Sequence, residues 1–114
     1  MVDFESLFDS NYLRWFHLPE KGLLIEIRRI DAKVEMQLPG KAEKQYKPVV
    51  HYIVKGGEVE KPLPFIMNKS NGKLIAAIHG RDASKWIGKE VVLVRDKTRL
   101  GKEIKDCIRV RSKK

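Results

Sequence analysis

The feature that most constrains the fold of this chain is a change in the spacing of its apolar residues. Apolar and polar residues alternate in three successive segments, which predicts strands at residues 22–36, 47–55 and 63–67. The spacing becomes helical at Leu74, Ile75 and Ile78, and alternation then returns at residues 87–95 and 103–111. A chain of 114 residues holds one domain, so all these elements must share one core.

The segment with helical spacing has recognisable signals at both ends. Asn68 or Ser70 can accept a hydrogen bond from the first turn, and Gly80 can end the helix in a backbone conformation that suits glycine. These signals predict a helix over residues 69–79. One further turn is expected at residues 82–86, before the next strand.

Three strands, one helix and two strands follow one another in the order of an OB barrel. The short connections imply antiparallel pairing, and closure would remove exposed sheet edges. We therefore predict an all-β fold with one short helix, a five-stranded OB-type barrel of order β-β-β-α-β-β over residues 21–114. Residues 1–20, in which Pro19 ends the aromatic stretch, form a partly helical N-terminal arm. The alternative is an open α+β sheet with the helix on one face.

The first strand contains a change of phase. Its apolar residues occupy odd positions as far as Ile27 and even positions from Ile30 onward. A regular strand cannot change parity without an extra residue, so the pattern predicts a β-bulge at Arg28 and Arg29.

Positive charge is concentrated in one quarter of the sequence. Residues 85–114 hold 11 basic and 4 acidic residues, and the whole chain carries a net charge of +9. Residues 1–20 hold four acidic residues and a single basic one, Arg14. A segregated positive field indicates a polyanionic partner, although surplus lysine also serves solubility.

Other features argue against several classes of protein. Cys107 is the single cysteine and allows no internal disulfide. The first ten residues do not have the pattern of a signal peptide, and no apolar run reaches 18 residues, so we expect no membrane association and a cytoplasmic location. His17, His51 and His79 have no partners at metal-ligand spacing. We therefore expect no enzymatic activity, no metal and no cofactor.

Basic side chains at strand positions are the stronger functional signal. In the second strand, Lys47 and His51 share one parity with Lys55, which we take as the outward face, and Tyr52 then points into the core. The opposite parity is the alternative. In the fifth strand Asp106 falls on the apolar face, and the pattern offers no reason for it.

Ligands of OB barrels lie across strands two and three, between the loops that join strands one to two and four to five. Here these loops, residues 37–46 and 96–102, both carry cations, and we expect those cations to lie near one another. Cations neutralise phosphates, and exposed rings stack on bases, for which Tyr46, His51 and Phe65 are the candidates. A core position for Phe65 is equally open. The predicted nucleic-acid-binding residues are Arg28, Arg29, Lys41, Lys44, Lys47, His51, Phe65, Arg95, Lys97, Arg99 and Lys102.

Three motifs in the second half of the chain resemble one known group of proteins. They are Asn68-Lys69-Ser70-Asn71, Trp86-Ile87-Gly88-Lys89 and Ile108-Arg109-Val110-Arg111. Together they are similar to small, mostly uncharacterised OB-fold-like proteins of bacteriophages, in which threonine usually stands at the position of Ser70. The resemblance covers roughly the last half of the chain. It implies an OB-like fold and binding of single-stranded DNA.

The predicted function is sequence-tolerant binding of single-stranded DNA, or of RNA, by a basic groove with stacking aromatic rings. The setting would be phage replication or recombination in the host-cell cytoplasm. The alternative is a protein-interaction module that binds a host or phage protein, for example as an inhibitor, through the basic face and the aromatic arm.

Overall fold

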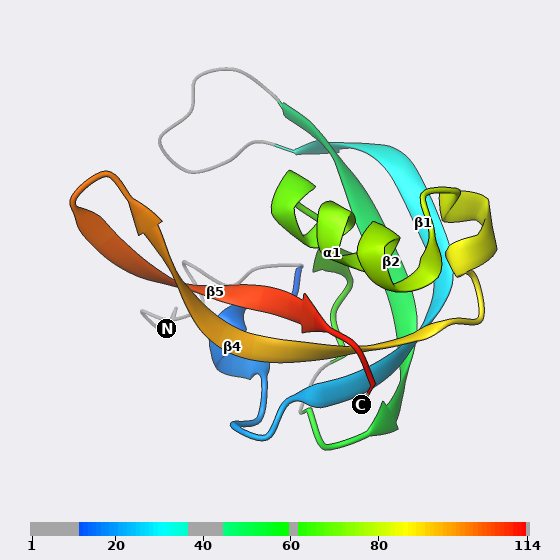
Figure 1. The fold of residues 1–114 in the computed structure, drawn as a ribbon, viewed down its shortest axis with the longest axis horizontal. Coiled ribbons are helices and arrows are strands. Elements are labelled where there is room, and N and C mark those ends of the chain that lie inside the picture. The colour runs from blue at the N-terminus through cyan, green and yellow to red at the C-terminus, as the bar shows by residue number, and fades with distance from the viewer. Residues whose placement is uncertain (1–11, 37–44, 60–61, 114) are drawn as a thin grey trace, which may run out of the picture.

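A computed structural model describes residues 12–36, 45–59 and 62–113. In these ranges five strands form one antiparallel sheet in the order β3-β2-β1-β4-β5, and one α-helix lies between β3 and β4 (Figure 1). The elements are η2 (Trp15–His17), β1 (Leu23–Met36), β2 (Gln45–Gly56), β3 (Phe65–Ile66), α1 (Lys69–His79), η3 (Ala83–Trp86), β4 (Glu90–Leu100) and β5 (Glu103–Arg111). The predicted order of elements and the predicted helix are confirmed.

The sheet is open between β3 and β5, so the prediction of a closed barrel is wrong. Closure would pair these two edge strands, but among the described residues β3 pairs only with β2 and β5 only with β4. β3 is two residues long because Pro62 and Pro64 precede it, and proline has no N–H to donate to a ladder. The helix α1 contacts β5 at the side where β3 would pair (Figure 1).

The side chain of Asn71, in α1, takes the place of a neighbouring strand at the edge of β5. Its amide nitrogen donates to the carbonyl oxygen of Ile108 at 2.9 Å, and its carbonyl oxygen accepts from the N–H of Val110 at 3.2 Å. Asn71 is 1% exposed, so water cannot replace these two bonds. One amide side chain therefore satisfies two backbone groups of the open edge.

Asn68, the other asparagine of the motif at residues 68–71, caps the start of α1. The side chain of Asn68 accepts from the N–H of Asn71 at 2.8 Å and so caps the helix, as predicted. At the other end Gly80 has a φ of 94°, which an L side chain rarely adopts.

The predicted bulge in β1 is confirmed. Ile27 pairs with Tyr52 and Arg29 pairs with His51, so Arg28 is the extra residue of the bulge. The shift keeps Ile27 buried and lets Ile30 pack against the core from the next stretch of strand. Both arginines are left exposed.

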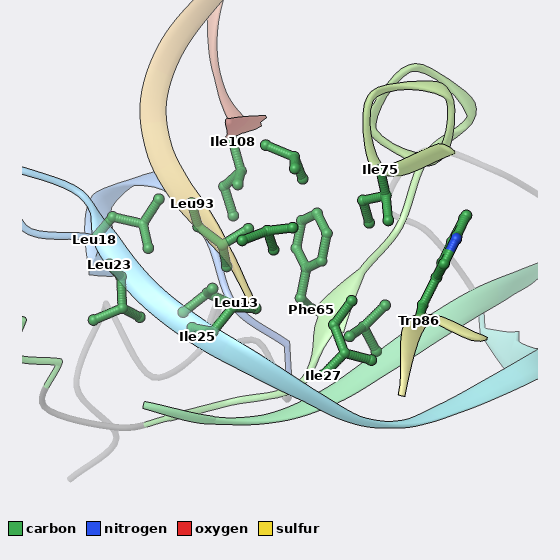
Figure 2. Close-up of a cluster of buried hydrophobic side chains, with 13 residues drawn as sticks. Leu13, Leu18, Leu23, Ile25, Ile27, Phe65, Ile75, Trp86, Leu93 and Ile108 are labelled. Atoms are coloured by element: carbon green, nitrogen blue, oxygen red, sulfur yellow. The ribbon is translucent and has the colours of Figure 1, made fainter. Parts of the chain in front are cut away.

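The core lies on the inner face of the sheet, and Phe65 stands among its side chains (Figure 2). Ile75 of α1 covers one side of this cluster, together with Trp86, which donates from its ring nitrogen to the carbonyl oxygen of Gly80 at 2.7 Å. Leu13 and Leu18 come from the described part of the arm and are also buried in it. This part of the arm therefore belongs to the same core as the sheet.

The second motif forms the crossing from the helix to β4. The N–H of Gly88 donates to the carbonyl oxygen of Ile27 at 2.7 Å, and the N–H of Ile27 donates to the carbonyl oxygen of Lys89 at 2.9 Å. Gly88 has a φ of 85°, in the region that favours glycine. The turn thus docks on β1, and β4 begins at Glu90 rather than at residue 87.

The loop predicted at residues 96–102 is wrong, because β4 continues to Leu100 and the connection is a two-residue turn at Gly101 and Lys102. Gly101 has a φ of 63°, the positive value that a two-residue hairpin with glycine first requires. β4 pairs with β1 only as far as Leu93. Residues 94–100 and 103–109 therefore form a projecting two-stranded hairpin, which we call the ribbon (Figure 1).

The ribbon also explains the position of Asp106. The buried part of β5 begins at Ile108, so Asp106 continues the same face of the strand beyond the core. There it is exposed, and its carboxylate lies 3.5 Å from the ammonium group of Lys97 across the ribbon.

Candidate nucleic-acid interface

The predicted cations on the outer face of β1 and β2 lie beside carboxylates. Arg28 is 2.8 Å from Glu26, and Arg29 is 3.2 Å from Asp31. The ring nitrogen Nε2 of His51 is 2.9 Å from Asp31 as well. The structure thus brings Arg28, Arg29 and His51 onto one face, but with acidic partners.

Asp31 keeps its negative charge on that face. The hydrogen bond from His51 is the largest cause that lowers its pKa, and the positive charge of Arg29 lowers it further. A carboxylate that remains ionised repels phosphate, and it engages the two nearest cations. The predicted cations of this face therefore share it with ionised carboxylates, and their role in binding stays a prediction.

Two residues of the predicted site have structural roles. Phe65 is 2% exposed, so its prediction as a stacking ring is wrong and its core alternative holds. Arg95 is exposed, and its guanidinium is bonded within the fold, so its role in binding stays a prediction. The guanidinium donates to the carbonyl oxygen of Leu18 at 2.7 Å and lies 5.8 Å from the ring centre of Trp15, so it fixes the arm to β4.

The remaining predicted cations of β4 and its turn lie along the ribbon. Lys97 pairs with Asp106, whereas Arg99 and Lys102 make no ion pair with any described residue. Lys41 and Lys44 lie outside the described residues, so their approach to the ribbon stays a prediction.

A concentration of cations that the sequence reasoning did not single out lines a groove between α1 and the start of β2. We call it the α1–β2 groove; its volume is about 510 Å³. Its described lining residues are Tyr46, Lys47, Pro48, Met67, Asn68, Lys69, Gly72, Lys73, Ala76, Arg81 and Trp86. Four of them are cations and none is a carboxylate. Of the four, only Lys47 belongs to the predicted site.

Spacing along α1 builds one bank of the groove. Lys69 and Lys73 are four residues apart, as are Gly72 and Ala76, so all four share one face of the helix. The two small residues leave room between the lysines, and a Cβ on Gly72 would lie 3.7 Å from the sulfur of Met67. The lysine spacing was the available signal, but nothing in the sequence showed that this face opposes β2.

The other bank comes from the first residues of β2. Tyr46 is 63% exposed, so its ring is available to a ligand, and Lys47 follows it. None of the four cations forms an ion pair with a described residue, in contrast to Arg28 and Arg29 on the outer face. The groove therefore combines four cations that form no ion pair with a described residue and an exposed aromatic ring.

Two observations concern metal-ligating and nucleophilic side chains among the described residues. They contain no group of three or more histidine, cysteine, aspartate or glutamate side chains that could hold a metal ion. Burial raises the pKa of the Cys107 thiol, which disfavours the reactive thiolate.

Comparison of the chain with protein-family models, curated proteins and solved structures finds no match. Within the part of the chain that the structure describes, no helix is long and apolar enough to cross a membrane.

Proposed function

We propose that this protein binds single-stranded DNA, or RNA, with little sequence preference. The observation that carries the proposal is the α1–β2 groove, with four cations and no carboxylate among its described lining residues, beside the exposed ring of Tyr46. Lysine and arginine contact phosphates without reading the base sequence. A nearby ring can then stack on a base.

Stacking on Tyr46 favours a single strand over a duplex, because the faces of paired bases are covered by their neighbours. Each stacked base contributes about 1–3 kcal/mol in proteins that bind single strands. Each neutralised phosphate of a single strand lowers the slope of log K against log salt by about 0.7. A strand that engages all four cations of the groove is thus expected to show a slope near –3, as an order of magnitude.

We also propose that the fold is an OB barrel opened between β3 and β5. The sheet order β3-β2-β1-β4-β5 and the helix between β3 and β4 support this class. The groove lies beside α1 rather than on the outer face of β2 and β3 that OB proteins commonly use. The resemblance of the three motifs to bacteriophage proteins supports a role in phage replication or recombination.

The test is a fluorescence-anisotropy titration with a labelled oligo(dT) of about 20 nucleotides, longer than one OB-type site. Salt is varied between about 50 and 200 mM. Lys69→Gln with Lys73→Gln is expected to weaken binding and to flatten the slope by about 1.4. The matched control, Lys85→Gln with Lys89→Gln, removes the same charge from exposed lysines outside the groove and is expected to leave most of the affinity.

Tyr46→Leu separates stacking from charge. It is expected to cost about 1–3 kcal/mol of binding free energy with the salt slope unchanged. No binding of the folded protein to oligo(dT) at low salt would end the proposal. Equal effects of the groove and control variants would show that only the net charge matters.

One observation favours the alternative function of a protein-interaction module. Phe16 of the arm is 54% exposed and lies edge-on to Trp15, with ring centres 5.7 Å apart. If oligo(dT) binding fails, a capture experiment with wild-type protein and Phe16→Ser tests whether this ring binds a protein partner.

A further inference from the structure

The proposed single-strand site makes no use of the ribbon, although the ribbon projects from the body of the protein (Figure 1). Pairing between β4 and β1 stops at Leu93, whereas pairing between β4 and β5 continues to Leu100 and Glu103. Over this length the two strands therefore pair with each other and with no other described strand. At about 3.3 Å per residue, residues 94–100 extend roughly 23 Å.

Charge on the ribbon is unevenly distributed. Between residues 94 and 109 there are six cations and three carboxylates. Two of the carboxylates are paired within the ribbon, Asp106 with Lys97 at 3.5 Å and Glu103 with Lys105 at 3.7 Å. The third carboxylate, on Asp96, accepts a hydrogen bond of 2.7 Å from the backbone N–H of Lys97.

The cations without partners lie toward the tip. Arg99 and Lys102 make no ion pair with a described residue, and both are exposed. Ile104, which pairs with Arg99 across the ribbon, is 65% exposed. The tip thus presents two cations and one apolar side chain to whatever it contacts.

These dimensions and charges fit a nucleic-acid duplex. The major groove of B-DNA is about 12 Å wide and admits a two-stranded β-ribbon. Paired strands lie about 4.8 Å apart, which leaves room for side chains on both edges. In such a groove Arg99 and Lys102 would reach phosphates or guanine edges, and Ile104 would meet apolar groups such as thymine methyls.

The ribbon and the α1–β2 groove flank the same helix. Lys69, Gly72 and Lys73 line the groove, whereas Asn71 bonds to β5 at Ile108, where the ribbon begins. A helix is about 10–12 Å across with its side chains, so the base of the ribbon lies about that far from the groove. The ligand then follows the ribbon over up to roughly 23 Å to reach the side chains at the tip.

We infer that the ribbon enters the major groove of a duplex while the α1–β2 groove holds the adjoining single strand, so that the protein recognises junctions between single-stranded and duplex DNA. The inference rests on the proposed single-strand function. Two contacts on one ligand act together and raise its affinity above that of either part alone.

The experiment compares three labelled ligands: oligo(dT) of about 20 nucleotides, a blunt duplex of about 15 base pairs, and that duplex with the oligo(dT) tail on either the 3′ or the 5′ end. The tailed duplex is expected to bind at least about tenfold more tightly than oligo(dT) alone. Arg99→Gln with Lys102→Gln should remove this advantage and leave oligo(dT) affinity within about twofold. Lys69→Gln with Lys73→Gln should weaken the binding of both oligo(dT) and the tailed duplex.

The ribbon variants change exposed residues outside the core and keep Gly101 of the turn, and a thermal melt confirms that they fold. Ile104→Ser provides a second ribbon variant with no change of charge. It should weaken binding of the tailed duplex but not binding of oligo(dT). The inference is overturned if the tailed duplex binds no more tightly than oligo(dT). It is also overturned if the ribbon variants weaken both ligands equally, or affect neither, which would assign the ribbon to the single-strand site or to a protein partner. Failure of wild-type protein to bind oligo(dT) would instead overturn the proposed function.

Discussion

Removal of the Asn71 side chain should be among the most destabilising polar changes in this protein. Asn71→Ala leaves the N–H of Val110 without a partner at a buried strand edge, and it leaves the carbonyl oxygen of Ile108 with only a long bond of 3.5 Å from the guanidinium of Arg109. Each buried polar group left unpaired costs about 1–3 kcal/mol. We expect the free energy of unfolding to fall by about 3 kcal/mol, and the melting temperature of a domain this size to fall by roughly 10–15 °C.

Asn71→Asp tests the hydrogen bonds separately from packing, because it has nearly the same shape. An ionised carboxylate still accepts from Val110 but faces the carbonyl oxygen of Ile108, and its charge is buried. Protonation restores a donor toward Ile108. Burial raises the pKa of the new carboxyl in the folded state, so its stability cost should be smallest near pH 4 and grow as the pH rises.

The assay is urea unfolding followed by tryptophan fluorescence at about pH 4 and about pH 7, with wild type measured at each pH as the reference. Asn68→Ala is the matched control, because it removes a helix cap and should cost only about 1 kcal/mol. If Asn71→Ala costs no more than this control, or if the Asn71→Asp cost does not change with pH, the side chain does not stand in for a strand.

Three further predictions concern other parts of the fold. The buried hydroxyl of Tyr52 has no hydrogen-bond partner among the described residues, so Tyr52→Phe should raise the free energy of unfolding, measured by urea unfolding, by about 1 kcal/mol. Burial also raises the pKa of Tyr52 from 10.0 to about 12. The wild-type free energy of unfolding should therefore be unaffected by this group below pH 10 and should fall as the pH rises from 10 to about 12. Tyr52→Phe should lose less of its free energy of unfolding over the same pH range. Gly22→Ala should destabilise by about 1–3 kcal/mol in a thermal melt, because Gly22 has a φ of 90° and a Cβ would lie 3.0 Å from two valine side chains of β4. Arg95→Gln should lower the free energy of unfolding by about 1–2 kcal/mol and shift the fluorescence of Trp15, but leave the affinity for oligo(dT) unchanged. A loss of affinity in the folded variant would show that Arg95 belongs to the binding site.

The sequence by itself determined the elements whose signals are local. Alternation and helical spacing indicated five strands and one helix in the right order, and Asn68 and Gly80 indicated the helix ends. The phase change located the bulge beside Arg28. These features follow from the side-chain period and from backbone preferences within a few residues, so neighbouring letters are enough to reveal them.

The tertiary structure alone decided which segments meet, and with that the site. Phe65 and Arg95 looked available for binding because the sequence does not show what lies against them, which is the core for one and the arm for the other. At the open edge of β5, two backbone groups bond to the side chain of Asn71 rather than to β3, and Asn71 and Ile108 are 37 residues apart in the sequence. The α1–β2 groove likewise requires Lys47 to face a helix that begins more than twenty residues later. Burial and charge compensation depend on such distant contacts, and local spacing carries no record of them.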